Sequence, residues 1–260
     1  MLRDFEIIIR EFPKNDDITI VPIADVHLGS KECREQDFIK FIKKVEETEN
    51  MFLILGGDLI DNGTRNSVTN VFRASMTPSE QKREMANILK PVADKIICAV
   101  SGNHERRSRD ADDDPTYDIL AKIDCENVYR ENAAFVKIRI GKANGDGEAN
   151  PTYSFMVTHG AGGGQLTSGA VLRGERMGYA VDGIDAIIFG HTHRPFTTVP
   201  GKIFFDTRNN KVSVKPFKVI NMSSWLDYTE YAMQKMLTPT VHNLHTITLR
   251  GNKKEMVVTM

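Results

Sequence analysis

Several short stretches of the chain are almost wholly apolar, and each is followed by glycine or polar residues. Continuous apolar runs of this length are typical of strands that are buried on both faces of a sheet. We therefore expect strands over residues 18–24, 51–55, 95–100, 153–157 and 186–189. Such strands occur in sheets that helices cover, so the pattern predicts an α/β fold.

Between these runs, apolar residues recur at helical spacing. Residues 35–49 have this spacing and predict an amphipathic helix. Thr77-Pro78-Ser79-Glu80 has the pattern of a capping box with proline in the first turn, and the helix that it begins should kink or end at Lys90-Pro91. Asp114-Pro115 should begin another helix, and residues 166–180 predict a helix interrupted by glycines.

Beyond about residue 125 the pattern becomes richer in strands. Residues 135–140 and 153–157 flank a Gly/Asn-rich segment at 141–147 and predict a hairpin. Within that segment, residues 144–148 lack the acidic spacing of a calcium loop. No stretch has the composition of a linker, so we expect one domain over residues 1–260. Further strands are expected at 203–205, 211–214, 217–220, 245–249 and 255–259.

Residues of the types that bind metals follow the predicted buried strands. Five of the seven histidines lie in these positions. Because open α/β sheets build their sites at the carboxyl ends of neighbouring strands, we expect these side chains to converge. Imidazole and carboxylate bind divalent first-row metals, which favours a metal-dependent hydrolase. The stretches are Asp25-Val26-His27, Gly56-Gly57-Asp58, Gly102-Asn103-His104, Thr158-His159-Gly160 and Gly190-His191-Thr192-His193.

The candidate metal ligands are Asp25, His27, Asp58, Asn103, His159, His191 and His193. Seven ligands are too many for one ion that must also bind water, but they suit two ions that share a carboxylate. Asp58 is the expected bridge, because a carboxylate offers two oxygens and a full charge. Mixed nitrogen and oxygen ligation favours two divalent ions, Mn²⁺ first, with Fe or Zn as alternatives.

Composition limits which binding partners and which cellular compartment we expect. The net charge of −1 provides no global basic field for nucleic acid, although a local basic patch remains compatible with it. Three cysteines without a CxxC pattern predict free thiols in a reducing compartment. The N-terminal residues do not resemble a signal peptide, and no run is long enough for a membrane helix. We therefore expect a cytoplasmic protein without a membrane partner, and the sequence predicts no particular oligomeric state.

In chain order the polar stretches have the pattern D-x-H, G-D-x-x-D, G-N-H-E, T-H-G and G-H-T-H between residues 25 and 193. This order resembles the calcineurin-like metallophosphoesterase superfamily, in particular its phage and bacterial members, and it is partly similar to DNA-repair exonucleases. The resemblance implies a four-layer α/β sandwich with two mixed β-sheets flanked by helices. It also implies that a metal-activated water hydrolyses a phosphate ester.

The resemblance also implies a role for each residue of the site. His104 would protonate the leaving oxygen as a general acid, and Asp61 would support the surrounding structure rather than bind metal. Independently of the resemblance, His242 and His245 lie outside the five stretches, and we expect them to be surface or fold residues rather than ligands. One metal would be held by Asp25, His27, Asp58 and His193, and the other by Asp58, Asn103, His159 and His191.

The substrate is less clearly indicated. Arg106 and Arg107 follow His104 and could bind substrate phosphates, but the same residues also fit a solvated helix start. Residues 160–164 could form a lid, a backbone anion site or a turn, with Arg173 and Arg176 just beyond them. These features favour a phosphodiester substrate, such as DNA or a nucleotide. The alternatives are a phosphomonoesterase, acting on a protein or a small molecule, and a non-catalytic scaffold, which the complete ligand set disfavours.

Overall fold

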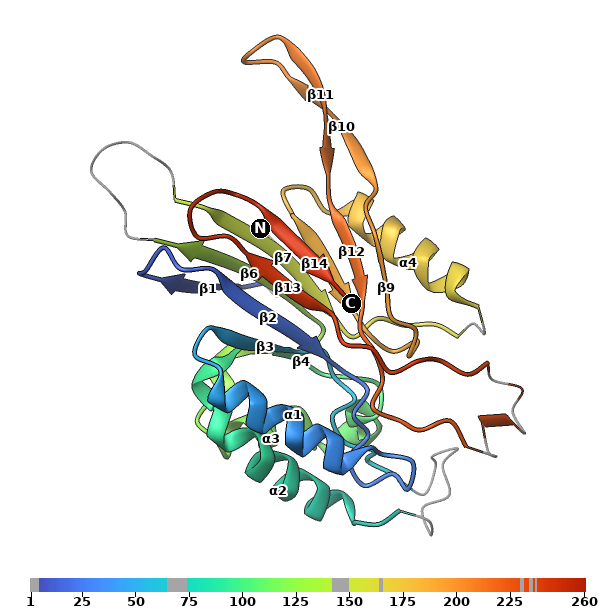
Figure 1. The fold of residues 1–260 in the computed structure, drawn as a ribbon. Coiled ribbons are helices and arrows are strands. Elements are labelled where there is room, and N and C mark those ends of the chain that lie inside the picture. The colour runs from blue at the N-terminus through green and yellow to red at the C-terminus, as the bar shows by residue number, and fades with distance from the viewer. Residues whose placement is uncertain are drawn as a thin grey trace.

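The computed structural model describes residues 5–64, 74–141, 150–163, 166–229, 232–233, 236 and 238–260. The predicted tip of the hairpin at 141–147 and the segment 144–148 lie almost entirely outside these residues. Two six-stranded sheets and one two-stranded sheet make up the β-structure of the described residues. The two large sheets face each other, with helices on both outer sides (Figure 1).

The first large sheet contains the buried strands of the N-terminal half. The strands β2 to β5 are neighbours in parallel, while β13 runs antiparallel to β2 and β14 antiparallel to β13. The sheet is therefore mixed, as expected. Its strands, in spatial order, are β14 (Met256–Thr259), β13 (Thr246–Leu249), β2 (Ile18–Ile23), β3 (Met51–Leu55), β4 (Ile96–Val100) and β5 (Tyr129–Arg130).

The second large sheet is also mixed. β6 is parallel to β1 and antiparallel to β7, which confirms the predicted hairpin pairing, and β8 is parallel to both β7 and β12. Its strands, in spatial order, are β1 (Ile7–Phe12), β6 (Ala133–Ile140), β7 (Thr152–Thr158), β8 (Ala186–Phe189), β12 (Lys218–Asn221) and β9 (Phe196–Thr198).

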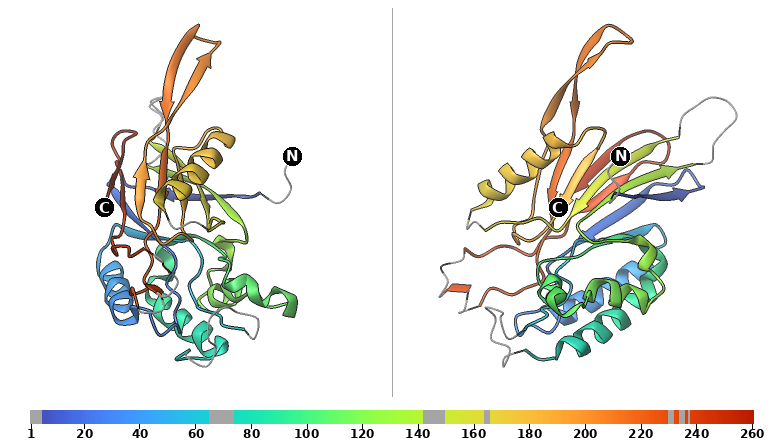
Figure 2. Two further views of the ribbon diagram at one scale, coloured as in Figure 1. Left: turned by 90° about the vertical axis from the view of Figure 1, so that its right-hand side faces the viewer. Right: turned by 180° about the vertical axis from the view of Figure 1, so that it is seen from behind.

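Helices α1 (Glu35–Glu47), α2 (Pro78–Leu89) and α3 (Pro115–Ala121) cover the outer face of the first sheet (Figure 2). Thr77 and Glu80 form the predicted capping box, and Asp114 caps α3 through the backbone N–H of Tyr117. Past Leu89 the chain tightens into a 3₁₀ turn, η2 (Lys90–Lys95), so the proline at position 91 ends the α-helix as expected. Two further 3₁₀ turns are η3 (Glu105–Ala111) and η4 (Glu126–Val128).

Helix α4 (Thr167–Ala180) covers the outer face of the second sheet and is continuous. The expected interruption was wrong, because two of its glycines are packing positions. A Cβ on Gly174 would lie 2.6 Å from the Phe189 ring, and one on Gly178 would lie 2.1 Å from the Phe217 ring. Glycine therefore lets the helix approach the sheet closely, which compensates for its low helix propensity.

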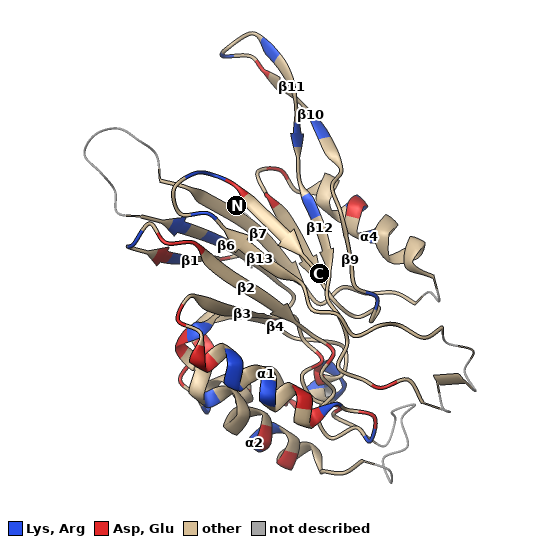
Figure 3. Cartoon of the chain, in the orientation of Figure 1, with Lys and Arg blue, Asp and Glu red and all other residues tan. Residues whose placement is uncertain are grey.

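Three buried apolar clusters lie between the layers. They explain why the apolar residues of strand β3 follow one another without a polar residue between them. Leu53 and Leu55 pack under the helices, whereas Ile54 between them packs into the core between the two sheets. Ile187 and Phe189 belong to a third cluster, between the second sheet and α4. The layers are therefore helix, sheet, sheet and helix, and the predicted α/β sandwich is confirmed. The inner strands β3 and β4 carry no charge, while α1 and α2 carry many (Figure 3).

A ribbon of two strands, β10 (Gly201–Asp206) and β11 (Lys211–Pro216), projects from the sandwich (Figure 1). The predicted strands at 203–205 and 211–214 lie in it, and Pro216 is its last residue. Its apolar side chains remain exposed, Ile203 at 81%. Elsewhere, the three cysteines are free thiols, as expected. No helix among the described residues is long and apolar enough to cross a membrane.

Candidate active site

The polar residues that follow the buried strands share an unusual backbone conformation. Asp25, His27, Asp58, His191 and His193 all have positive φ, between 51° and 68°. This left-handed region is strained for residues with a Cβ, and such strain persists only where the surrounding structure enforces it. It reverses the chain sharply after β2, β3 and β8, so that side chains from both sheets turn toward one region.

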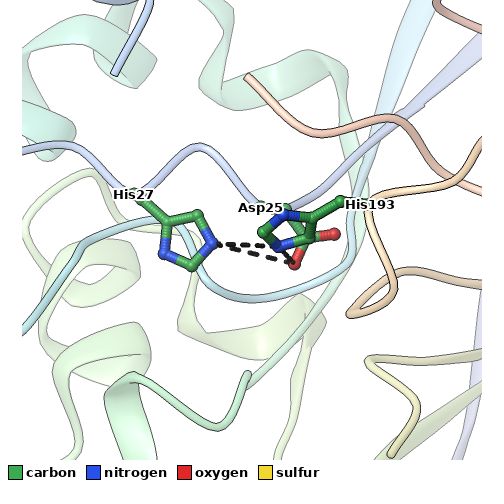
Figure 4. A group of neighbouring side chains, drawn as sticks. All are labelled: Asp25, His27 and His193. Atoms are coloured by element: carbon green, nitrogen blue, oxygen red, sulfur yellow. Dashed lines mark hydrogen bonds and ion pairs between the residues drawn. The ribbon is translucent and has the colours of Figure 1, made fainter. Parts of the chain in front are cut away.

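The first cluster of this region contains Asp25, His27 and His193 (Figure 4). His193 Nε2 lies 3.3 Å from both Asp25 Oδ1 and His27 Nε2. Asp25 is fully buried, and its Oδ1 has no hydrogen-bond partner among the described residues. A buried carboxylate oxygen without a partner is costly, and a cation held by these three residues would remove that cost.

The second cluster contains Asp58, Asn103, His159 and His191. His159 Nε2 lies 3.3 Å from Asp58 Oδ2 and 3.0 Å from Asn103 Oδ1. His191 Nδ1 lies 2.6 Å from Asn103 Oδ1 and 3.2 Å from His159 Nε2. Four ligand-type atoms from the ends of β3, β4, β7 and β8 therefore surround one point.

Asp58 connects the two clusters. Its Oδ2 lies 3.8 Å from His27 Nε2 in the first cluster and 3.3 Å from His159 Nε2 in the second. All seven predicted ligands are thus brought together, with one carboxylate between two groups of imidazoles. This nitrogen and oxygen donor set fits two divalent first-row ions.

The charges of the clusters are strongly coupled. Burial opposes ionisation of Asp58, but the hydrogen bond and charge of His159 outweigh it and hold the pKa of Asp58 well below its ordinary value. Against the effect of burial, Asp58 raises the pKa of His159 to about 9. Burial lowers the pKa of His27 and of His191, and neighbouring histidines add to the effect. Asp58 therefore favours a positive charge beside it, which is the electrostatic property of a metal-binding carboxylate.

Several contacts orient the ligands from behind. His159 Nδ1 donates to the carbonyl of Gly56 at 2.8 Å, which leaves its Nε2 to face Asp58. Asp25 Oδ2 accepts from the backbone N–H of His191 at 2.9 Å and so links the ends of the two sheets. Such contacts select the tautomer and the direction of a ligand.

His104 lies beside both clusters. Its Nδ1 is 2.8 Å from the carbonyl oxygen of Asp61, and its Nε2 is 3.9 Å from Asp58 Oδ2. Burial opposes protonation, but the contacts with Asp61 and the charge of Asp58 raise the pKa of His104. Arg107 Nη2 lies 2.8 Å from His104 Nε2, so in this arrangement the guanidinium donates to that nitrogen. Asp61 thus contacts His104 twice, since its carboxylate Oδ1 also lies 3.3 Å from Nδ1.

Glu105 is a residue that the sequence reasoning did not assign. Its fully buried carboxylate accepts four backbone N–H groups: those of Asp58 and Gly102 at 2.9 Å on Oε2, and those of Leu59 and Ile60 at 2.6 and 3.2 Å on Oε1. Burial and the charge of Asp58 raise the pKa of Glu105, but four donors around two oxygens match the ionised form.

The consequence of this arrangement is that Glu105 holds the loop after β3 against the loop after β4. These loops carry Asp58 and Asn103, two members of the second cluster. The only sequence signal was its position beside His104, together with the many N–H groups that glycine-rich turns leave unpaired.

The two predicted substrate arginines point to different places. Arg107 donates to His104 and to the carbonyl of Asp61 at 3.1 Å. Arg106 Nη2 donates to the carbonyl of Ser101 at 3.0 Å, and the residue lines a cavity on the far side of the loop after His159. Only Arg107 therefore lies against the predicted catalytic residue.

A cavity of about 400 Å³ opens directly onto the clusters. We call it the histidine cavity, because His27, His104, His191 and His193 line it. Further lining residues come from the chain after β12, namely Leu226, Asp227, Tyr228, Thr229, Ala232, Thr238 and Thr240. The two remaining histidines lie elsewhere: His242 contacts Trp225, and His245 is buried without a partner for either ring nitrogen among the described residues.

The strand ends of the two mixed sheets converge on two neighbouring clusters of Asp, Asn and His side chains. This arrangement defines the class as an α/β sandwich with residues able to bind metal. The chain belongs to the calcineurin-like phosphoesterase family, whose model matches residues 18–195. The resemblance inferred from the sequence is therefore confirmed, and the matched span includes both clusters, His104 and Glu105.

Two solved structures are similar at 11% identity. One is a conserved uncharacterised protein of Streptococcus pneumoniae, a predicted phosphoesterase; the match covers 94% of this chain and 98% of that one, with a TM-score of 0.35. The other is the NAD nucleotidase of Haemophilus influenzae, with 94% and 49% covered and a TM-score of 0.42, so this chain spans about half of that protein. No curated protein matches the sequence.

Proposed function

We propose that the protein is a phosphodiesterase that uses two divalent metal ions, Mn²⁺ first among them, to hydrolyse a nucleotide-type or nucleic-acid ester. The observation that carries the proposal is the position of Asp58 between two clusters of imidazoles. One metal would be held by Asp25, His27, Asp58 and His193, and the other by Asp58, Asn103, His159 and His191. When bound, two such ions supply an activated water and neutralise charge on the phosphate.

The protein residues then position the ester and supply a proton. His104 faces the histidine cavity beside the clusters and is the candidate acid for the leaving oxygen. Its Nε2 accepts from Arg107, so a proton can occupy that nitrogen only when the guanidinium turns away. A substrate phosphate offers Arg107 a stronger partner than a neutral imidazole, because it carries negative charge and can accept two parallel N–H bonds from the guanidinium. Substrate binding would thereby free His104 to act.

The metal content is the first test. Metal-stripped protein refilled with Mn²⁺ should hold two ions per chain by elemental analysis. Asp58→Asn should reduce that number, since it removes the charge shared by both clusters. Asp182→Asn is the matched control, because Asp182 is exposed and lies outside the site, and it should retain two ions. A parent protein that binds one ion or none would contradict the proposal.

The reaction is the second test. The refilled protein should hydrolyse bis-p-nitrophenyl phosphate faster than p-nitrophenyl phosphate; the reverse preference would indicate a phosphomonoesterase. His104→Ala should slow cleavage of dithymidylate more than cleavage of the nitrophenyl diester, because nitrophenolate leaves without a proton and an alkoxide does not. Equal slowing of the two substrates would refute the role of His104. Metal binding without hydrolysis of any ester would point to a scaffold.

A further inference from the structure

A second cavity, of about 550 Å³, lies between α4 and the carboxyl ends of β7 and β8. We call it the arginine cavity, because Arg106, Arg173 and Arg176 line it. None of its lining residues, all of which belong to the described part of the chain, is Asp or Glu. Three cations thus face one space without a carboxylate, an arrangement that favours an anionic ligand.

Two guanidinium groups of this cavity each have a donor without a hydrogen-bond partner among the described residues. Arg106 is anchored on the carbonyl of Ser101, yet its Nε is buried and has no partner among the described residues. Arg173 donates from Nη1 to the carbonyl of Gly163, while its buried Nη2 has none there either. Buried donors without partners are rare, and a small turn of either side chain would bring its donor onto an anion with several oxygens in the cavity.

The opposite wall of the cavity is apolar. Ile187 and Phe189 lie there, buried in the cluster between the second sheet and α4, and Met177 and Ala180 extend this surface. Gly174 leaves the wall open at the point where a side chain would meet Phe189. A pocket with cations on one side and an apolar surface on the other suits a ligand with an anionic group and a flat or apolar body.

The loop after His159 separates this cavity from the site of the proposed reaction. Thr158, Gly160 and Ala161 line the arginine cavity, while Gly162 and Gly163 line the histidine cavity. A ligand that crosses this loop can therefore reach both.

The two cavities differ in charge. The histidine cavity is lined by three carboxylic residues, Glu32, Asp61 and Asp227, and by Arg194, whereas the described residues that line the arginine cavity include three arginines and no carboxylic residue. The arginine cavity, whose described lining offers cations and no carboxylate, is therefore a favourable place for a further phosphate of the substrate, next to the ester held at the metal site.

We propose that the arginine cavity binds a second phosphate of a nucleotide-type substrate, next to the ester that the metal site cleaves. This inference rests on the proposed function for its placement, but the anion binding itself can be measured without any metal. The ligand class is a phosphorylated nucleotide or a short single strand with a terminal phosphate. In such a ligand the terminal phosphate contacts the arginines and the adjoining nucleoside lies on the apolar wall.

The test compares dithymidylate with and without a 5′-phosphate. Binding is followed by calorimetry on metal-free protein in EDTA at constant ionic strength, so that neither hydrolysis nor metal ligation contributes. The parent should bind the 5′-phosphorylated form about tenfold or more tightly, as a charge-assisted contact predicts. Arg176→Gln should abolish that preference; Arg176 is exposed and has no hydrogen bond or ion pair with the described residues, so the fold should tolerate the change. Arg173→Gln should weaken the preference as well.

Arg208→Gln is the matched control, since Arg208 lies exposed in the turn of the projecting ribbon and loses the same charge. It should keep the full preference. Equal affinity of the parent for the two dinucleotides, or an equal loss in the Arg208 variant, would overturn the proposal. Failure to hydrolyse any diester after refilling with Mn²⁺ would instead count against the proposed function, because the calorimetric comparison in EDTA would still stand.

Discussion

Replacing Glu105 by Gln tests whether one buried carboxylate holds the candidate site together. Each oxygen of Glu105 accepts two backbone N–H groups. In Glu105→Gln one oxygen becomes an NH₂ group, which faces two donors and can accept from neither. Two hydrogen bonds to a charged group are lost, at about 1.5–3 kcal/mol each, and release of the buried charge offsets part of that. We expect a net loss of about 2–4 kcal/mol in the free energy of unfolding.

The assay is urea unfolding of the metal-free protein in EDTA, followed by circular dichroism. Glu46→Gln is the matched control, because Glu46 is exposed on α1, and it should change stability by less than about 0.5 kcal/mol. The Glu105 variant should also bind Mn²⁺ more weakly, since the loops carrying Asp58 and Asn103 lose their common anchor. A Glu105→Gln protein that unfolds within about 0.5 kcal/mol of the parent would refute the reasoning.

Three further predictions concern parts of the molecule outside the two metal-type clusters. Gly174→Ala should lower the free energy of unfolding by about 1–3 kcal/mol, because its Cβ would meet Phe189. Gly169→Ala should raise that free energy by up to about 1 kcal/mol, because a Cβ there meets only Arg173, at 3.6 Å. Thermal unfolding of both variants measures the difference. Burial lowers the pKa of His245 to about 4. Between about pH 6.5 and this value, the His245 imidazole therefore binds a proton in the unfolded chain but not in the folded chain. The stability that depends on His245 should therefore be lost as the pH falls from 6.5 to about 4, and His245→Leu should reduce the loss over this window; an unchanged pH profile would contradict this. Replacing residues 201–216 by a two-residue turn should preserve Mn²⁺ binding, since the N–H of residue 217 already donates to the carbonyl of residue 200; loss of the metal would show that the ribbon supports the site.

Local pattern predicted much of the fold because strand and helix formation depend on side chains close in the sequence. The apolar run at 51–55 became β3, and Thr77 and Glu80 formed their capping box, since both signals are complete within a few residues. The glycines of α4 were misjudged for the opposite reason. Their effect depends on Phe189 and Phe217, which belong to other elements and come close only in the folded chain.

The sequence by itself determined the identity, number and order of the metal-type ligands, because ligand chemistry resides in the side chain and each ligand directly follows its strand. Only the tertiary structure decided which of them meet, since Asp25 and His193 are far apart in the chain and lie 3.3 Å apart in space. It also decided the left-handed backbone at the strand ends, the four hydrogen bonds to Glu105 and the separation of two cavities by the loop after His159. These features arise from contacts between two sheets, which no local pattern encodes.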